Sequence, residues 1–526
     1  MTDESQSLMP SRFKPSLTKP LVLATLVACF GSIQYGYHMS ELNAPQQVLS
    51  CSRTVVPPGV DYPYEHTWLG RHGFDKCVSL DDQQIGLVTS IFSLGGLAGS
   101  LYAGNLADKY GRKRVSFFNS TLGILGSLLL FRSNSYGSLL FGRFTAGVSC
   151  GSSIVITPLL INEISPHEWK GALGSMNQVS INIGILVAQL LALRWADSFR
   201  WRWLLFFGAI LALLNFLLLF VIDESPKWLL SRGEVDQAES ILHGLRGGHR
   251  QHSRDEINEW LTLRGDRSRS QQQTPSQTRD SLRTIKPSHV SPPTYNPLPS
   301  ANSTISTEQS SEEEMSLWQY ITSPKYTKSR RAITAILMGQ QFCGINSIIF
   351  YGVKVISDLL PDQAILANFG ISILNVVVTF GASPLVDHWG RKPLLITSAT
   401  SMSLASSLIS YGILTSNAVL LVVFTFVYIG VFAVGLGPIP FLVIPELSPV
   451  EAVGKAQSYG TTCNWLATFI IGYGFPILNS WLGGAVFFLF SSFAILFAIY
   501  VYYEIPETKG KKDYYEVWGE RPEQHI

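Results

Sequence analysis

Residues 105–114 read NLADKYGRKR and residues 384–393 read PLVDHWGRKP, so one charged pattern occurs twice in the chain. Two more pairs of strings follow in the same order: INEISP at 161–166 with IPELSP at 444–449, and DESPK at 223–227 with PETKG at 506–510. The glutamates of these pairs lie 61 positions apart in both halves: Glu163 and Glu224, then Glu446 and Glu507. Equal spacing indicates a duplicated unit, and such repeats are typical of membrane transporters.

The composition is that of an integral membrane protein. Of 526 residues, 46% are hydrophobic and only 14% are charged, whereas a soluble domain has ~25% charged residues. Twelve stretches are long and apolar enough to cross a ~30 Å hydrocarbon core, near 20–38, 83–105, 115–132, 138–162, 171–193, 203–222, 331–355, 363–386, 393–414, 418–445, 456–478 and 480–503. We therefore expect an all-α membrane protein with twelve transmembrane helices in two pseudo-symmetric six-helix bundles.

Five segments follow from this pattern. They are a cytoplasmic tail at 1–19, a bundle at 20–222, a cytoplasmic loop with short helices at 223–330, a second bundle at 331–503, and a tail at 504–526. Charged residues gather in the loops and the net charge is only +2, so we expect no nucleic-acid partner.

Lys and Arg beside short loops set the orientation. Lys109, Lys170 and Arg391 each follow an even-numbered span, and cationic loops favour the cytoplasm. Both termini are then cytoplasmic, and the loop from 39 to 82 is exoplasmic. It holds Cys51 and Cys77, which predict either a disulfide on the oxidising side of the membrane or two free thiols.

The cytoplasmic tail and loop carry the candidate protein contacts. From about 265 to 315 the sequence is rich in Ser, Gln, Thr and Pro and has too few apolar residues for a core, which predicts a disordered linker. Its hydroxyl groups are candidate kinase sites, with a passive tether as the alternative. Glu4 with Leu8 and Met9 loosely matches an acidic dileucine sorting signal.

A polar patch interrupts the seventh span, where residues 339–352 read GQQFCGINSIIFYG. Amides in hydrocarbon are costly unless they are paired. Gln340, Gln341 and Asn346 share one half of a helix circumference and can line a cavity. Each amide alone could instead join helices by hydrogen bonds; the three together favour a site for a neutral, hydroxyl-rich ligand. We see no nucleophile, acid–base pair, metal-ligand cluster or cofactor motif here, so we expect no enzyme.

Charges at the cytoplasmic helix ends predict a gate. Ion pairs that form when this side is closed and break when it opens would bias one conformation by a few kcal/mol, although cationic ends could simply anchor the spans to lipid headgroups. The proposed gate residues are Asp108, Arg112, Arg143, Glu163, Lys170 and Glu224 in the first half, and Asp387, Arg391, Glu446, Lys455 and Glu507 in the second.

At these residues the chain resembles the sugar porters of the major facilitator superfamily, and it is similar to fungal hexose-type carriers and facilitative glucose transporters. The motifs that carry the resemblance are GRKR at 111–114, GRF at 142–144, DESPKWLL at 223–230, QQFCGIN at 340–346, DHWGRK at 387–392, GPIPF at 437–441 and PETKG at 506–510. The resemblance implies the major facilitator fold, a sugar substrate, and a multi-pass location in the plasma or vacuolar membrane.

By this resemblance the sugar ligands fall on amides and aromatic residues of both halves. They are Gln178, Gln340, Gln341, Asn346, Asn375, Phe441, Asn464 and Trp465. Amides both donate and accept hydrogen bonds, as sugar hydroxyls do, and an aromatic face packs on the C–H side of a pyranose. Phe441 stands where many glucose carriers have Trp, and Ala433 where some have Glu, so the preferred sugar stays open.

The resemblance leaves the energy source open at His38. Proton-coupled sugar symporters generally have Asp at this point, next to the Arg of the fourth span, here Arg143. Because like charges disfavour protonation, His38 beside Arg143 would stay neutral. We therefore expect facilitative transport of a monosaccharide or polyol. The alternatives are a proton-coupled symporter, a His38 that senses an acidic lumen, and a non-transporting sugar sensor.

Overall fold

Twelve membrane-crossing segments form two bundles of six, as expected. The computed structural model describes residues 17–166, 169–248, 251, 253–262, 316–449, 452–511 and 514–519. Eleven stretches meet the length and hydropathy of a membrane span; the longest, Val453–Glu504, contains two helices. The candidate sorting signal and the 265–315 linker lie outside the described residues.

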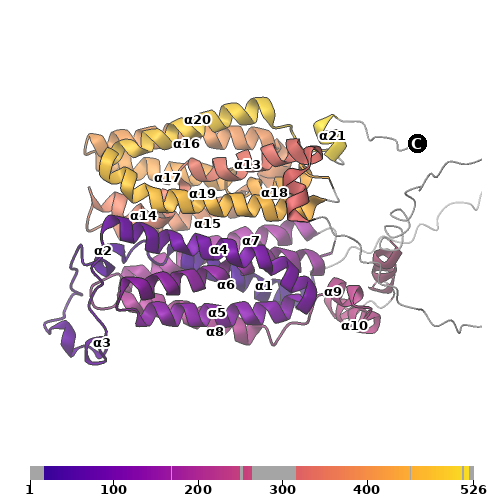
Figure 1. Ribbon diagram of the computed structural model, residues 1–526, viewed down its shortest axis with the longest axis horizontal. Helices are drawn as coiled ribbons and strands as arrows, with labels where there is room; N and C mark the ends of the chain where they lie inside the picture. The colour runs from indigo at the N-terminus through magenta and orange to yellow at the C-terminus, as the bar shows by residue number, and fades with distance from the viewer. Residues whose placement is uncertain are drawn as a thin grey trace, which may run out of the picture. The chain divides into compact units, whose positions relative to one another are not determined.

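The N-terminal half is built from six long helices, coloured indigo to magenta in Figure 1. Their bounds are α1 Lys19–Ser40, α4 Asp82–Tyr110, α5 Arg112–Arg132, α6 Tyr136–Ile164, α7 Lys170–Trp195 and α8 Trp201–Leu218. Small residues let helices approach closely: a Cβ on Gly99 of α4 would lie 2.1 Å from the Val148 carbonyl oxygen of α6.

The C-terminal half repeats this plan with two of its spans broken. Its helices are α13 Thr327–Phe342, α14 Ile345–Ser357, α15 Ala364–Trp389, α16 Arg391–Leu414, α17 Ala418–Val434, α18 Ile439–Glu446, α19 Val453–Leu482 and α20 Val486–Glu504. α4 packs against α19 and α7 against α15, so equivalent helices of the two halves make equivalent contacts.

The seventh span, which we expected to be one helix, breaks at Gly344. This glycine has φ of +95°, and a Cβ there would lie 2.6 Å from the Phe490 ring. Only glycine suits both constraints. Breaking a helix exposes carbonyl groups; here the Tyr428 hydroxyl donates to the Cys343 carbonyl oxygen at 2.7 Å. The tenth span breaks between α17 and α18, around Leu436–Pro438.

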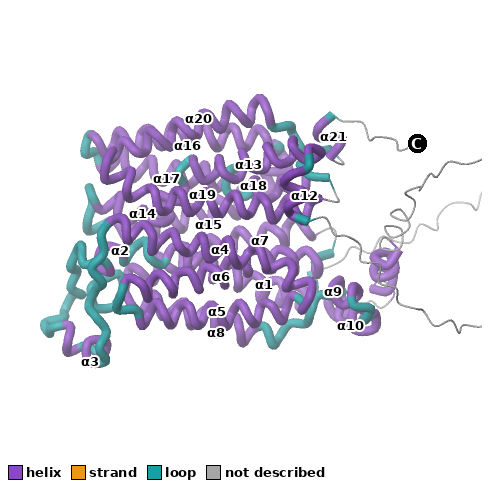
Figure 2. The backbone as a smooth tube through the Cα atoms, in the orientation of Figure 1, coloured by secondary structure: helices purple, strands orange, loops and turns teal. Residues whose placement is uncertain are grey.

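The exoplasmic loop is tied to the N-terminal half. Cys51 and Cys77 form a disulfide with an S–S distance of 2.07 Å, which confirms the first of the two alternatives. Arg202, which is 1% exposed, donates to the carbonyl oxygens of Phe131, Ser133 and Asp75. The short helices α2 Gln46–Leu49 and α3 Trp68–Arg71 complete the loop (Figure 2).

Short helices also lie at the cytoplasmic ends of the bundles: α9 Pro226–Ser231, α10 Val235–Leu245, α12 Leu317–Thr322 and α21 Tyr514–Trp518. Residues 253–262, in the second compact unit, are helical as well.

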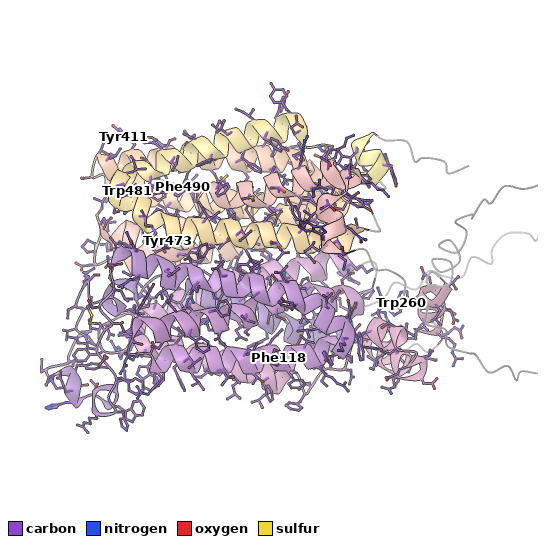
Figure 3. All side chains as sticks on the ribbon, viewed as in Figure 1. Phe118, Trp260, Tyr411, Tyr473, Trp481 and Phe490 are labelled. Carbon is purple, nitrogen blue, oxygen red and sulfur yellow. A yellow bond between two sulfur atoms is a disulfide. The ribbon has the colours of Figure 1, made fainter. Side chains whose placement is uncertain are left out.

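Aromatic side chains mark the outside of the bundles, as expected at membrane interfaces. Trp481 is 77% exposed and Tyr411 is 52% exposed, and both lie at the exoplasmic ends of their helices (Figure 3). Tyr503, at the cytoplasmic end of α20, is 76% exposed.

Candidate functional site

The amides of the seventh span form one continuous hydrogen-bonded group. Asn464 Nδ2 donates to Gln340 Oε1 (2.9 Å), Gln341 Nε2 donates to the same oxygen (3.3 Å), and Asn346 Nδ2 donates to Gln341 Oε1 (2.5 Å). Asn346 Nδ2 also lies 3.4 Å from Thr468 Oγ1. We call these five residues the amide network; sequence reasoning missed Thr468, because a threonine in a span usually bonds within its own helix.

The two broken helices position the amide network. Gln340 Nε2 donates to the Leu436 carbonyl oxygen at 2.6 Å, so it satisfies a carbonyl freed by the break in the tenth span. Asn346 lies in the first turn of α14, just after the break in the seventh. Its side chain is 0% exposed, and no donor reaches its Oδ1 atom among the described residues. A buried acceptor without a donor is expected at a ligand site.

A second group of amides crosses from one half to the other. Asn182 of α7 donates through Nδ2 to Thr379 Oγ1 (2.8 Å) and lies 3.4 Å from Asn375 Oδ1, both on α15. Gln178 Nε2 lies 3.5 Å from Asn182 Oδ1. The structure thus brings Gln178 and Asn375 together through Asn182, a residue that the sequence analysis missed although it lies one turn after Gln178.

The aromatic candidates have different surroundings. Trp465 of α19 is 4% exposed and packs on Tyr35 and Phe92 of the N-terminal half, with ring centroids 5.8 and 6.2 Å apart. It is therefore part of the contact between the halves. Phe441 of α18 is 37% exposed, and no ring contact to it is recorded among the described residues.

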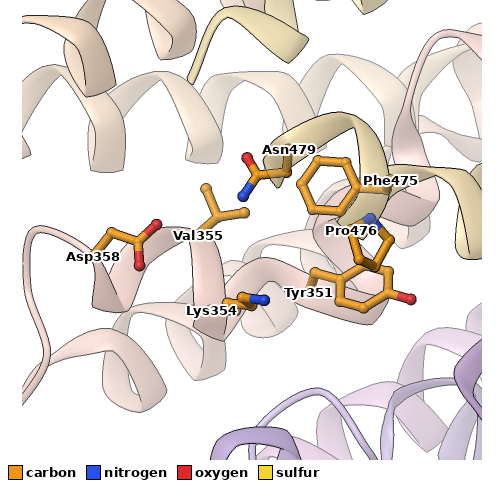
Figure 4. Close-up of a pocket in the computed structure, with 7 residues that line it drawn as sticks. All are labelled: Tyr351, Lys354, Val355, Asp358, Phe475, Pro476 and Asn479. Carbon is orange, nitrogen blue, oxygen red and sulfur yellow. The ribbon is translucent and has the colours of Figure 1, made fainter. Parts of the chain in front are cut away.

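A small pocket lies apart from the amide network, near the exoplasmic end of α14 and α19 (Figure 4). Tyr351, Lys354, Asp358 and Phe475 are among its lining residues. Burial raises the pKa of Asp358, and the Lys354 ammonium partly opposes this rise. Lys354 itself forms an ion pair with Asp82 of α4 at 2.8 Å, which joins the two halves.

His38, Glu41 and Arg143 form a buried triad at the exoplasmic end of the N-terminal half. His38 Nδ1 lies 3.0 Å from Glu41 Oε2, and Arg143 Nη1 lies 2.9 Å from Glu41 Oε1. Arg143 Nη1 also donates to the His38 carbonyl oxygen at 2.8 Å. All three are 1% exposed or less. Sequence reasoning placed His38 beside Arg143 but missed Glu41, whose spacing of three from His38 was the available signal.

Arg143 must be corrected as a member of the cytoplasmic gate. It lies early in α6, which begins at Tyr136 on the exoplasmic side and ends at Ile164 on the cytoplasmic side. The helix therefore separates Arg143 from Glu163 by most of its length. Its guanidinium also contacts the Phe92 ring, 4.6 Å from the centroid.

Most of the other gate residues form two equivalent cytoplasmic clusters, one in each half. In the first, Arg112 pairs with Glu163 (2.8 Å) and Asp108 (3.0 Å). In the second, Arg391 pairs with Glu446 at 3.0 Å, and the Thr508 hydroxyl donates to Glu446 at 2.5 Å.

A carboxylate caps a helix in each cluster. Glu224 accepts from the backbone N–H groups of Arg112 (2.8 Å) and Lys113 (3.0 Å) at the start of α5. Glu507 accepts from those of Arg391 and Lys392, both at 3.0 Å, at the start of α16. Negative charge at a helix N-terminus is stabilising, so these glutamates fix where each helix begins.

No recorded ion pair joins the two cytoplasmic clusters, within the part of the chain that the structure describes. Lys170 and Lys455 form no ion pair with another described residue, and the side chain of Asp387 lies outside the described residues. Besides the contacts of Asn182, polar contacts between the halves lie at the exoplasmic end. Asn43 Nδ2 donates to the Ile349 carbonyl oxygen (2.8 Å), and its Oδ1 accepts from the Val353 N–H (3.0 Å).

Comparison with known protein families gives one consistent result. The family profile described as "Sugar (and other) transporter" matches residues 24–286 and 270–515. A Saccharomyces cerevisiae protein described as "Probable metabolite transport protein" is 53% identical over 98% of this chain and 99% of its own. The vacuolar protein sorting-associated protein 73 of the same yeast is 46% identical over 95% of this chain and 96% of its own.

More distant matches include human facilitated glucose transporter member 4, which is 29% identical over 94% of this chain and 89% of its own. Among solved structures, the xylose transporter XylE of E. coli in a partially occluded inward open conformation superposes with a TM-score of 0.69. That match covers 94% of this chain and 100% of XylE at 20% identity, so it concerns the fold.

Proposed function

The chain belongs to the sugar transporter family of the major facilitator superfamily, and from this we propose that it carries a monosaccharide or a related polyol across its membrane by alternating access. As a member of this family it is a multi-pass membrane transporter, and not an enzyme. The finer parts of the proposal are the ligand, the residues that bind it and the energy source.

The observation that carries the proposal is the buried acceptor Asn346 Oδ1 at the end of the amide network. Burying a polar atom without a partner costs ~1–3 kcal/mol, and a hydroxyl donor from a ligand would remove this cost. Gln341 and Asn464 lie in the same network and can both donate and accept. This chemistry suits an uncharged ligand with several hydroxyl groups.

Gln178, Asn182 and Asn375 extend the proposed site to the other half. Their mutual hydrogen bonds are 3.4–3.5 Å long, near the limit for such bonds. A sugar hydroxyl could replace them at little cost. A ligand that bonds both halves would then couple its own binding to their relative movement, which alternating access requires.

The test is a competition panel of unlabelled hexoses, pentoses and polyols against one radiolabelled sugar, in cells that lack their own sugar carriers. We expect saturable uptake, competition by a subset of the panel, and weaker competition for a correctly folded Gln341→Ala protein. Unchanged apparent affinity in that variant would return Gln341 to a structural role. Binding without uptake would favour the sugar sensor.

For the energy source we propose facilitative transport, as in the named glucose transporters. A second candidate is proton-coupled symport, and one observation favours it: Glu41 supplies beside Arg143 the carboxylate that was expected to be missing. Uptake in energised vesicles separates the two. Accumulation above equilibrium that a protonophore and Glu41→Gln both abolish would establish symport, whereas simple equilibration that neither changes would establish facilitative transport.

For the location we propose the vacuolar membrane, with the plasma membrane as the alternative. The support is the name of one relative, which refers to vacuolar protein sorting. Fractionation of the tagged full chain against markers of both membranes tests this choice.

A further inference from the structure

The outer surface of the N-terminal half carries an apolar stripe on α5 and another on α8. Leu125 and Leu129 of α5 and Ile210 of α8 are exposed. Because both helices span the membrane, their exposed apolar sides face lipid. Residues three, four and seven positions apart share one side of a helix. By this spacing the α5 stripe ends at Arg132 and the α8 stripe at Trp203, both at the exoplasmic end of their helices.

Aromatic rings continue these stripes beyond the helix ends. Phe131 of α5 contacts Trp203 and Phe206 of α8, with ring centroids 5.5 and 5.1 Å apart. Phe74 of the exoplasmic loop packs on Phe131 at 5.0 Å. Trp68 of α3 packs on Trp203 at 5.9 Å. We call these five residues the aromatic cluster; it leads from the lipid-facing sides of α5 and α8 to α3.

Hydrogen bonds hold the loop against the same helix ends. Trp201 Nε1 of α8 donates to the Lys76 carbonyl oxygen at 2.8 Å. Asn134 Nδ2, just after α5, donates to the Gly73 carbonyl oxygen at 2.8 Å. Leu69 of α3 is buried in a small apolar core with other residues of the loop. This buried side fixes which side of α3 faces away from the protein.

The outward side of α3 carries a tryptophan between two arginines. α3 lies beyond the exoplasmic ends of α5 and α8, on the outer side of the bundle (Figures 1 and 2). Trp68 is 54% exposed. Arg71 follows one helical turn later and is exposed. Arg132, also exposed, lies over the Phe74 ring, 5.0 Å from its centroid. These three side chains are thus at the level where the lipid-facing stripes end.

Phospholipid headgroups fit this surface better than water does. A tryptophan ring is apolar but carries a polar N–H, so it prefers the boundary between hydrocarbon and water. Arginine can lay its stem along apolar surface and bind a phosphate through two parallel hydrogen bonds. The exposed acids Asp61, Glu65 and Asp75 balance the arginines of this segment. A phospholipid without net charge therefore suits the surface.

We propose that α3 and the aromatic cluster form an interfacial anchor that inserts into the exoplasmic leaflet of the membrane. Trp68 lies at the level of the lipid headgroups in this arrangement, and Arg71 and Arg132 bind phospholipid phosphates. The buried side of α3 stays on the protein. The partner is the lipid surface itself, and the anchor is separate from the sugar site.

The Cys51–Cys77 disulfide connects this anchor to the contacts with the other half. Cys77 directly follows the loop segment that is bonded to α8. Cys51 lies four residues after Gln47, whose Nε2 donates to Ser357 Oγ of α14 at 3.1 Å. The anchor therefore holds the loop at a constant depth while α14 moves relative to the N-terminal half.

The test measures the depth of α3 in phosphatidylcholine liposomes. The four free cysteines are replaced by Ala. A nitroxide is then attached to Arg71→Cys or to the reference Asp362→Cys, because the Asp362 side chain is 94% exposed. We expect oxygen, which concentrates in lipid, to relax the nitroxide at position 71 more than a water-soluble nickel chelate does, and the reverse at position 362. Equal access of the nickel chelate to both positions would overturn the proposal.

Two pairs of variants identify the side chains that hold α3 in the lipid. Trp68→Ala should raise nickel access at position 71 to that of the reference, whereas Trp481→Ala, at an exposed tryptophan of the C-terminal half, should leave it unchanged. Arg132→Glu repels phosphate and should also raise it. Arg53→Glu, at a loop arginine 3.6 Å from Asp362, should not. Equal effects of the anchor variants and their controls would overturn the proposal.

A second copy of the chain is the other neighbour that could cover α3. Dipolar broadening between nitroxides at position 71 would reveal such a copy and would overturn the lipid anchor. None of these measurements uses sugar, so the failure of the transport proposal and the failure of this one are distinguishable.

Discussion

At the scale of single residues, Asn346 is the most informative side chain of the sugar site. Asn346→Leu keeps its size but removes both polar groups, so a bound sugar would lose a partner for one hydroxyl. We predict that sugar affinity falls by roughly 1–3 kcal/mol. Direct binding to purified protein measures this. Ser372→Ala is the control, because its hydroxyl bonds to the Asn368 carbonyl oxygen within α15; equal losses in both variants would remove Asn346 from the site.

Asp358 gives a prediction about pH and stability. Burial raises its folded-state pKa above the ordinary 3.8, so the folded protein binds this proton more tightly than the unfolded chain does. The protonated carboxyl favours the folded state below pH ~3.8, and this contribution is lost as the pH rises through the raised pKa. Asp358→Asn should therefore raise the unfolding temperature near pH 7 and change it little near pH 3.5. A variant that is less stable than the wild type near pH 7 would contradict this.

Some residues of the candidate sites could be predicted from the sequence, and others could not. The amides Gln340, Gln341 and Asn346 were predictable, because adjacent polar groups in a span are costly and few. Glu41 was harder to recognise: its spacing of three from His38 was a signal, but it follows the apolar stretch of the first span and reads as a loop charge. Only the folded chain shows that it is 1% exposed and pairs with Arg143.

At the scale of elements, each cytoplasmic cluster stabilises the N-terminus of a helix in its own half: α5 in the first half and α16 in the second. Glu224→Gln keeps an acceptor for the α5 N–H groups but loses the charge, and we predict a loss of stability of about 1 kcal/mol. Thermal unfolding in detergent measures it. Glu507→Gln should cost a similar amount at α16, whereas Asp223→Asn, an exposed neighbour, should cost little. A loss confined to Asp223→Asn would refute the capping role.

The element scale explains why the breaks in the seventh and tenth spans could not be predicted. By length and hydropathy, each of the two spans was predicted to be one uninterrupted helix. The break at Gly344 depends on the Phe490 ring, which is far away in the sequence. The free carbonyl of Leu436 depends on Gln340 of another helix. Hydropathy therefore predicts where the chain crosses the membrane, and tertiary contacts decide where a crossing helix breaks.

At the scale of the whole molecule, the two halves are joined by polar contacts at the exoplasmic end. Asn43→Ala removes the hydrogen bonds to Ile349 and Val353, so it should favour opening toward that side. We predict faster reaction of a cysteine at buried Thr89 with a membrane-impermeant maleimide from outside. Asn134→Ala is the matched control, because Asn134 bonds to Gly73 within the same half. Equal rates in both variants would show that Asn43 does not hold the halves together.

The duplicated plan was predictable from the whole sequence, because equal spacing of charged motifs needs no tertiary information. The contacts between the two halves could not be predicted from the sequence. The glutamates and arginines of the proposed gate, which could have paired across or within the halves, pair within their own halves, and Arg143 lies at the opposite end of its helix.

The central claim is that the molecule moves sugar and does not merely bind it. Purified protein in sealed liposomes should exchange internal unlabelled sugar for external labelled sugar until the isotope is evenly distributed. Asn346→Leu should slow this exchange at low sugar concentration. Exchange no faster than in protein-free liposomes, by a wild-type protein that still binds the same sugar, would contradict transport and identify a receptor.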